Sequence, residues 1–498
     1  MELNPKGLFF EKISRPEAFT LLAFFVPLIL RAIPEILMGS YIVGFDTLAH
    51  YVPTTLGWLG EGVSFWAFVA IAPFLHVMLF GATFIGIPIV ISLKVMSPLL
   101  LGFLGIAVYF YANKILSWSP KKSLLVVFFT TLYFVALRIS WDMLRSELAL
   151  IFLFVTLFFL KKDDNPFRNG LLLSLAMLAV VFAHQLVSLI MFAIVLATII
   201  RLSFDRQMGN VGKLIVCSIP AIFLFLLTVY ANSVVFPQFS IVNGWLNQSS
   251  ESYLIFGFVS YQDLVVDTLG FLVFCYLPLL PLVILGVRRL RNNLQLNTWV
   301  LCIIVALSLA LVNIFVAHLP YRWILLLTYP LAFYAAEGFA CLSLTSHKII
   351  VGLILATLST SFIFLPNSIA LPYYSMFPLY MPTSMLQNTV SLSDCQDTMN
   401  ALQWVKTNIG SNASLLVHRA FYGWASLTLN ENQLIFYNYY DPATVAQELT
   451  EDGSHYQLWL IWWVNGSGWY DEPTVSSAFG EILHENGKMA IYMYTANA

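Results

Sequence analysis

The residues best suited to chemistry lie in a short polar interval that follows the first apolar segment of the chain. Asp46 and His50 are four residues apart there, within the sequence Gly-Phe-Asp-Thr-Leu-Ala-His-Tyr at positions 44–51. A carboxylate with few charged neighbours can act as the general base that takes a proton from an attacking hydroxyl or amine. Asp46 can equally cap a helix, because the residues around it are typical of a helix start. The sequence alone leaves both interpretations open.

A second group of charged residues lies where two later apolar segments meet. Arg138, Asp142 and Arg145 are four and three residues apart, so on one helix they would share a face. A cluster with spare positive charge at a membrane surface suits a lipid phosphate, because arginine makes bidentate contacts with phosphate oxygens. Arg322, which directly follows Tyr321, is a candidate for the same role. The alternative is that these arginines reach water from helix ends.

Some of these residues are also of the types that bind divalent metal ions. The candidate ligands are Asp46, His50, Asp142, Glu147 and His184. Their spacing matches no metal-binding motif, so a divalent metal is an alternative rather than an expected cofactor. His184 lies at a predicted turn between two apolar segments, where a lone histidine can also be purely structural.

Membrane-spanning helices must position these side chains, because the chain is too apolar for a soluble protein. Of its 498 residues, 59% are hydrophobic and 10% are charged, and the mean hydropathy is +0.81. Apolar runs of about 20 residues recur, which is the length that crosses a bilayer as a helix. The first run, at 19–34, is read as a retained span, because no small-residue cleavage site follows it. The net charge of −2 argues against nucleic acid as a partner.

The basic residues predict how the helices cross the membrane. Lys6, Lys12 and Arg15 precede a first span at about 17–34, which places the N-terminus in the cytoplasm. We expect about 13 spans, three of them within 64–115 at 64–80, 82–95 and 97–115. Most of the remaining lysines and arginines then fall on the inner side. Arg31 and Glu35 are expected to form a helix-end pair, and Lys94 has no assigned role.

The composition changes after residue 366, which predicts three parts. Residues 1–366 form a transmembrane domain, 367–392 form a connecting loop at the outer surface, and 393–498 form a soluble α/β domain outside the membrane. In the last part we expect a helix from Asp394 to about Ile409, capped by Asp394. Short strands are expected at 414–417, 433–437, 457–463 and 489–494.

This layout resembles the GT-C superfamily of polyprenyl-phosphate-dependent membrane glycosyltransferases. That superfamily includes protein O-mannosyltransferases, aminoarabinose transferases and oligosaccharyltransferases. The resemblance covers most of the chain and includes the outer domain of archaeal members. The segments that carry it are 44–51, 145–150, 183–186, 321–332, 401–410 and 421–424. It implies an all-α polytopic bundle with a small outer domain.

The resemblance also implies roles for single residues. In that family an acid in the first outer loop is catalytic, and here that acid is Asp46. The donor is a sugar on a polyprenyl or dolichyl phosphate, and basic residues hold its phosphate. The residues expected at the donor phosphate are Arg145, Arg322, Arg138 and Tyr321, and those expected around the substrates are His50, Asp142, Glu147 and His184.

Two departures from the family concern the acceptor. The Trp-Trp-Asp-Tyr-Gly motif of oligosaccharyltransferases is absent, and Thr47 stands where many protein mannosyltransferases have a second acid. Both departures weigh against a protein acceptor, but neither decides among lipid, glycan and protein acceptors. The expected activity is an inverting glycosyl transfer at the outer face of the cell membrane. The rivals are a lipid-linked sugar flippase, which would need charges near the bilayer midplane and inverted repeats, and a non-catalytic glycan-binding scaffold.

Overall fold

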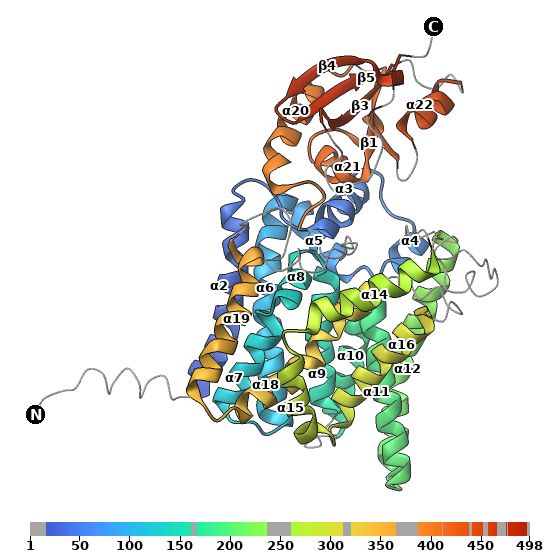
Figure 1. Ribbon diagram of the computed structural model, residues 1–498. Coiled ribbons are helices and arrows are strands. Elements are labelled where there is room, and N and C mark those ends of the chain that lie inside the picture. The colour runs from blue at the N-terminus through green and yellow to red at the C-terminus, as the bar shows by residue number, and fades with distance from the viewer. Residues whose placement is uncertain are drawn as a thin grey trace, which may run out of the picture.

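A large helical bundle carries a smaller α/β region at one end (Figure 1). The structure is a computed structural model, and it describes residues 16–160, 166–236, 260–311, 320–364, 387–410, 412–437, 441–451, 457–465, 475 and 477–495. The polytopic helical fold with a small C-terminal sheet confirms the fold class predicted from the sequence.

The bundle consists of long apolar helices and several short ones that interrupt or cap them. They are α2 (Pro16–Leu37), the π-helix η1 (Thr47–Tyr51), α3 (Val52–Gly60), α4 (Phe65–Ala70), α5 (Phe74–Phe84), α6 (Ile89–Phe110), the π-helix η2 (Tyr111–Ile115), α7 (Pro120–Thr131), α8 (Phe134–Asp142), α9 (Leu144–Phe159), α10 (Pro166–Ala183), α11 (Gln185–Phe204), α12 (Met208–Val235), α14 (Tyr261–Tyr276), α15 (Leu280–Leu290), α16 (Leu294–Leu311), α17 (Pro320–Leu326), α18 (Thr328–Cys341) and α19 (Thr345–Phe364).

Several of these helices are long enough to cross a membrane. Among the described residues, five qualify by length and composition, and seven qualify if each of two bent pairs counts as one span. The bent pairs are α7 with α8, which meet at 61°, and α14 with α15, which meet at 80°. Shorter apolar helices lie between them, so the expected total of about 13 spans stays a prediction.

The predicted division of 64–115 into three spans is wrong. The stretch forms the 6-residue α4, the 11-residue α5 and the long α6. The chain turns at Ala72 and Gly86, which have φ angles of 50° and 93°. It does not turn near Lys94, whose amine donates to the backbone oxygen of Glu35 at 2.8 Å from within α6. Of these three helices, only α6 with η2 is long and apolar enough to count as a span by itself, and α5 is one of the shorter apolar helices. The orientation of the later helices stays a prediction.

The C-terminal region is built on one five-stranded sheet. Its elements are η7 (Leu392–Asp394), α20 (Cys395–Asn408), β1 (Ala413–His418), α21 (Arg419–Ser426), η8 (Glu431–Gln433), β2 (Leu434–Tyr437), α22 (Pro442–Glu451), β3 (Gln457–Trp463), η9 (Ser477–Phe479), β4 (Glu481–Asn486) and β5 (Met489–Met493). The strand order is β2-β1-β3-β5-β4. Strands β2, β1 and β3 are parallel, and β5 is antiparallel to both β3 and β4.

Four of the five strands agree with the sequence prediction, and β4 was missed. Strand β4 lies at the edge of the sheet, and its sequence Glu-Ile-Leu-His-Glu-Asn lacks a buried apolar face. The expected helix is confirmed as α20, but the expected cap is wrong. The Asp394 carboxylate makes no capping bond and instead accepts hydrogen bonds from Trp463 at 3.1 Å and Lys488 at 2.6 Å.

Candidate active site

Asp46 occupies the position directly before the π-helix η1. It makes no capping bond to the backbone of η1. Its Oδ2 accepts a hydrogen bond from Arg322 Nη2 on α17 at 2.9 Å. The two side chains are 15% and 25% exposed, so this ion pair is partly accessible. These contacts argue against the helix-cap interpretation of Asp46 and leave its carboxylate available for chemistry.

Asp142 holds the backbone of Asp46 from the end of α8. The N–H of Asp46 donates to Asp142 Oδ2 at 3.0 Å. Arg138 Nη2 donates to the same oxygen at 2.9 Å, and a second contact joins Arg138 to Asp142 Oδ1. Arg138 and Asp142 are both only 1% exposed. Their charges are therefore paired with each other, and the pair acts on Asp46 through its backbone.

The expectation that Arg138, Asp142 and Arg145 share one helix face is wrong. Arg138 and Asp142 do form an ion pair four residues apart on α8. The helix breaks at Met143, whose ψ of 45° is not helical, and Arg145 belongs to α9. Arg145 is half-buried, and it makes no hydrogen bond or ion pair with any residue that the structure describes. It is thus a cation without a described protein partner.

Gly44 allows the Asp46 loop to lie against the end of α8. Its φ of +112° is strained for any residue with a side chain. A Cβ at this position would lie 2.4 Å from the backbone oxygen of Trp141 and 3.0 Å from Cβ of Asp142. The contact between Asp46 and Asp142 therefore requires glycine at position 44.

We predict that Gly44→Ala disrupts the site and lowers stability. The positive φ costs about 1–3 kcal/mol for a non-glycine residue, and the contact with Trp141 adds to that cost. Gly39→Ala is a matched control, because Gly39 also has a positive φ, +56°, but an added Cβ meets nothing within 4 Å. Thermal unfolding in detergent should show a larger loss for Gly44→Ala. Equal losses in the two variants would contradict the proposed contact.

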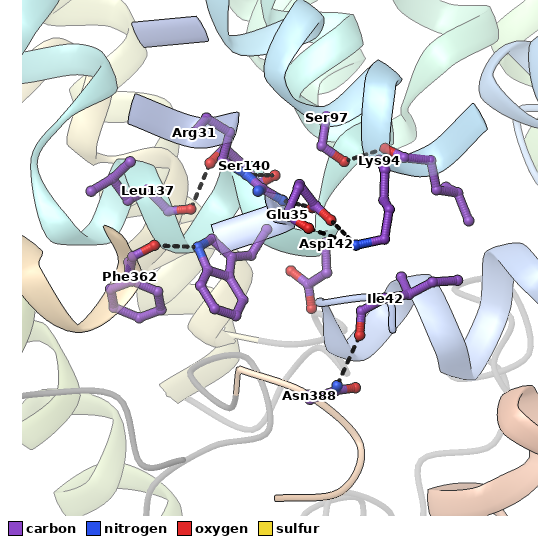
Figure 2. A network of polar contacts seen from close by, with 12 residues as sticks. Arg31, Glu35, Ile42, Lys94, Ser97, Leu137, Ser140, Asp142, Phe362 and Asn388 are labelled. Carbon is purple, nitrogen blue, oxygen red and sulfur yellow. Dashed lines mark hydrogen bonds and ion pairs between the residues drawn. The ribbon is translucent and has the colours of Figure 1, made fainter. Parts of the chain in front are cut away.

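A network of charged side chains from α2 and α6 contacts the end of α8 (Figure 2). Arg31 is fully buried, donating through Nε to the backbone oxygen of Ser140 at 3.0 Å and through Nη2 to Glu35 at 2.8 Å. The Lys94 amine, already bonded to the Glu35 backbone, also lies 3.5 Å from its carboxylate. The expected pair of Arg31 with Glu35 is confirmed. It anchors the last turn of α8, which carries Asp142.

The charges around Asp46 and His50 set their protonation states. Burial raises the pKa of Asp46, but Arg322, His50, Arg138 and Arg145 outweigh it and hold the pKa below its usual 3.8. Desolvation by the surrounding protein lowers the pKa of His50 below 6.5. Asp46 opposes this shift, and Arg322, Arg145 and Arg419 add to it. At neutral pH Asp46 is therefore a carboxylate and His50 is neutral.

The other predicted site residues lie deeper in the protein or face different partners. His184, between α10 and α11, is 3.2 Å from Ser146 Oγ through its Nε2 atom. Glu147 is fully buried, and neither of its carboxylate oxygens bonds to a described residue. Tyr321 is 6% exposed, and its ring packs edge-on against Phe271 at 5.3 Å. The structure thus groups Asp46 with Arg322, Asp142 and Arg138, and brings Arg145 and His50 near them.

The five candidate metal ligands do not gather into a metal centre. Within the ranges that the structure describes, no group of three or more histidine, cysteine, aspartate or glutamate residues is placed to hold a metal ion.

Sequence reasoning missed one charged residue near the site, Arg419 of the C-terminal region. Arg419 begins α21 directly after β1, and its charge acts on His50. One feature of the sequence could have identified Arg419: it closely follows a predicted strand, and α/β folds often bind ligands at the carboxyl ends of parallel strands. The sequence analysis treated this region as a separate outer domain.

Comparison with known proteins identifies the architecture. No family model and no curated protein sequence matches the chain. Among solved structures, the crystal structure of ArnT from Cupriavidus metallidurans bound to undecaprenyl phosphate aligns with 97% of this chain and 97% of its own, with a TM-score of 0.52 and 14% sequence identity. The chain has a GT-C fold. At this identity the likeness shows the fold alone, so the roles of single residues depend on the geometry above.

The GT-C fold accounts for the arrangement of both regions. It agrees with the resemblance noted in the sequence, which placed a helical membrane bundle below a small outer sheet domain. The named subgroups, including the archaeal members and the protein O-mannosyltransferases, stay predictions.

Proposed function

We propose that this chain is a glycosyltransferase that moves a sugar from a polyprenyl-phosphate donor to an acceptor hydroxyl at the extracytoplasmic membrane face. The main support is the partly exposed Asp46 carboxylate, held by Arg322 at 2.9 Å and through its backbone by Asp142 at 3.0 Å. Arg145 lies close enough to lower the pKa of Asp46. The ArnT structure, which shares the fold over 97% of the chain, was determined with undecaprenyl phosphate bound.

The proposed chemistry is a direct displacement at the anomeric carbon. Asp46 takes the proton of the acceptor hydroxyl while the hydroxyl oxygen forms a bond to the anomeric carbon. The bond between the anomeric carbon and the phosphate oxygen breaks, and the lipid phosphate leaves with the bonding electrons. Attack from the face opposite the phosphate inverts the anomeric configuration. Arg145 stabilises the charge that develops on the leaving phosphate.

The ion pairs of the site suggest different roles for its arginines. Arg322 orients the Asp46 carboxylate and adds positive charge beside the donor. Arg138, expected at the donor phosphate, is buried and bonded to Asp142, so we assign it to positioning. Arg145 has no described partner and is our first choice as the phosphate ligand. His50, on the exposed side of η1, would lie beside the acceptor.

The proposed location follows from the predicted orientation. With a cytoplasmic N-terminus, α2 brings the chain to the outer face, and the loop carrying Asp46 follows directly. The C-terminal α/β domain then lies outside the membrane and covers this loop. We propose the boundaries predicted from the sequence, 1–366 for the membrane domain and 393–498 for the outer domain.

The protonation states predict a flat pH profile near neutrality. Asp46 stays ionised until the pH falls below 3.8, and His50 stays neutral above pH 6.5. We therefore expect kcat/KM to change by less than about twofold between pH 6.5 and pH 8. The ionised Asp46 also stabilises the folded site at neutral pH, and this stabilisation is lost as the pH falls below 3.8. An acid limb centred between pH 6.5 and pH 7.5 would contradict these assignments.

A donor-turnover assay tests the proposed function. The protein, purified in detergent, is incubated with a radiolabelled polyprenyl-phosphate sugar and with hydroxyl acceptors, with and without divalent metal or chelator. We expect time-dependent loss of the donor and release of polyprenyl phosphate. In proteoliposomes, movement of intact donor between leaflets without bond cleavage would identify a flippase instead. Binding without either activity would identify a scaffold.

A further inference from the structure

The outer domain forms part of the candidate active site. Leu48, two residues after Asp46, is fully buried and packs in the same hydrophobic core as the outer-domain helices and sheet. Helix α21 lies directly on η1, since a Cβ at Gly423 would be 1.9 Å from the backbone oxygen of Leu48. Figure 1 shows α21 next to α3, the helix that continues from η1. The turn that carries Asp46 and His50 is therefore fixed by the outer domain.

Two hydrogen bonds fix the other end of the same loop. The N–H of Gly44 donates to the backbone oxygen of Gln387 at 3.0 Å. The Asn388 side chain donates to the backbone oxygen of Ile42 at 3.1 Å (Figure 2). Residues 42–48 thus contact α8 on one side, and the end of the connecting loop and the outer domain on the other.

Arg419 is the cation that the outer domain places at this junction. It is the half-buried first residue of α21, where the helix N-terminus adds partial positive charge. Its charge reaches His50, which is exposed on η1. On the membrane side, Arg322 pairs with Asp46 and Arg138 pairs with Asp142. Arg145 belongs to α9 of the bundle, whereas Arg419 belongs to α21 of the outer domain.

We infer that Arg419 is a specificity-determining residue that binds an anionic group of the acceptor, next to the hydroxyl that attacks. The inference depends on the proposed function, because it assigns the acceptor side of the same reaction. In the proposed function, Arg145 in the bundle binds the donor phosphate. An acceptor held against α21 meets a guanidinium, which binds phosphate and carboxylate groups in a bidentate manner. The acceptor class is then a hydroxyl compound with a phosphate or carboxylate close by.

Acceptor preference in the donor-turnover assay tests this inference. The probes are glycerol, glycerol 3-phosphate and phosphatidylglycerol in mixed micelles, so a soluble and a lipid-borne phosphate are compared with a neutral hydroxyl. For the wild type we expect kcat/KM to be about tenfold or more higher with a phosphate-bearing probe than with glycerol. Arg419→Gln should remove this preference by raising KM, while turnover with glycerol changes little. Arg419→Lys should keep most of the preference.

Controls separate the two proposals. Lys406→Gln removes an exposed cation of the same domain, on α20, and should leave the preference unchanged. Higher salt should weaken the wild-type preference, which tests the charge even if Arg419→Gln folds poorly. Three results would overturn the role of Arg419. The wild type could show no preference for phosphate-bearing acceptors, its preference could be insensitive to salt, or the preference could survive in folded Arg419→Gln. Failure to cleave the donor in any arm overturns the proposed function instead.

Discussion

Replacing Asp46 with asparagine is expected to abolish sugar transfer while donor binding survives. An amide cannot accept the proton of the attacking hydroxyl, and loss of a general base typically costs about 10²–10⁴-fold in rate. The change is otherwise small, because the asparagine oxygen can still accept from Arg322, and the backbone N–H of residue 46 still donates to Asp142. Single-turnover transfer and direct donor-binding measurements on the purified variant would separate the two effects.

Glu61→Gln provides the matched control for Asp46. Glu61 is an exposed acid in the same outer interval, at the end of α3. Its replacement should leave transfer within about twofold of the wild type, since surface substitutions usually have small effects. Near-normal transfer by Asp46→Asn would show that Asp46 is not the base, and a loss of donor binding would show that its charge supports the site rather than the chemistry.

Replacing Arg145 with glutamine should cause the second-largest loss of activity without a loss of stability. A hydrogen-bond donor that faces a developing negative charge typically contributes about 10²–10³-fold to the rate. Arg145 bonds to no described residue, so removing its charge breaks no described contact in the folded protein. Its half-buried guanidinium pays a desolvation cost, and its removal should leave the melting temperature unchanged or raise it.

Arg138→Gln is expected to behave in the opposite way. This change leaves Asp142 buried without its ion pair, which typically costs about 3–5 kcal/mol of stability. Melting temperatures in detergent, with kcat and KM for the donor, would distinguish the two arginines. If Arg145→Gln melts early and keeps the wild-type KM for the donor, Arg145 is structural and the phosphate site lies elsewhere.

Much of the fold follows from local sequence features. Long apolar runs cannot leave backbone groups unpaired in lipid, so the helices are predictable from composition. Strand β3, Gln457–Trp463, is rich in bulky apolar residues and was predicted with its observed bounds. Strand β4 was not predicted, because this edge strand buries few side chains and its sequence has no alternating apolar pattern. The division of 64–115 failed because a charged residue inside an apolar run suggests the end of a span, and the sequence does not show that Lys94 is bonded to Glu35 from within a helix.

The candidate site depends on contacts between distant parts of the chain. Asp46 and Arg322 are 276 residues apart, and although each was a candidate from the sequence, no local pattern pairs them. The break at Met143 is not apparent from the spacing of the charges, which therefore placed Arg145 on the same helix as Arg138. Arg419 was missed because docking of α21 onto η1 depends on tertiary packing around Leu48.

The most direct measurement is an experimental structure of the Asp46→Asn variant with an intact polyprenyl-phosphate sugar bound. The expected result places the donor phosphate within hydrogen-bond distance of the Arg145 guanidinium. The anomeric carbon should face the side chain of residue 46, with open space between them for an acceptor hydroxyl. A phosphate bound away from Arg145, or a sugar on the far side of α8 from residue 46, would contradict the proposed reaction centre.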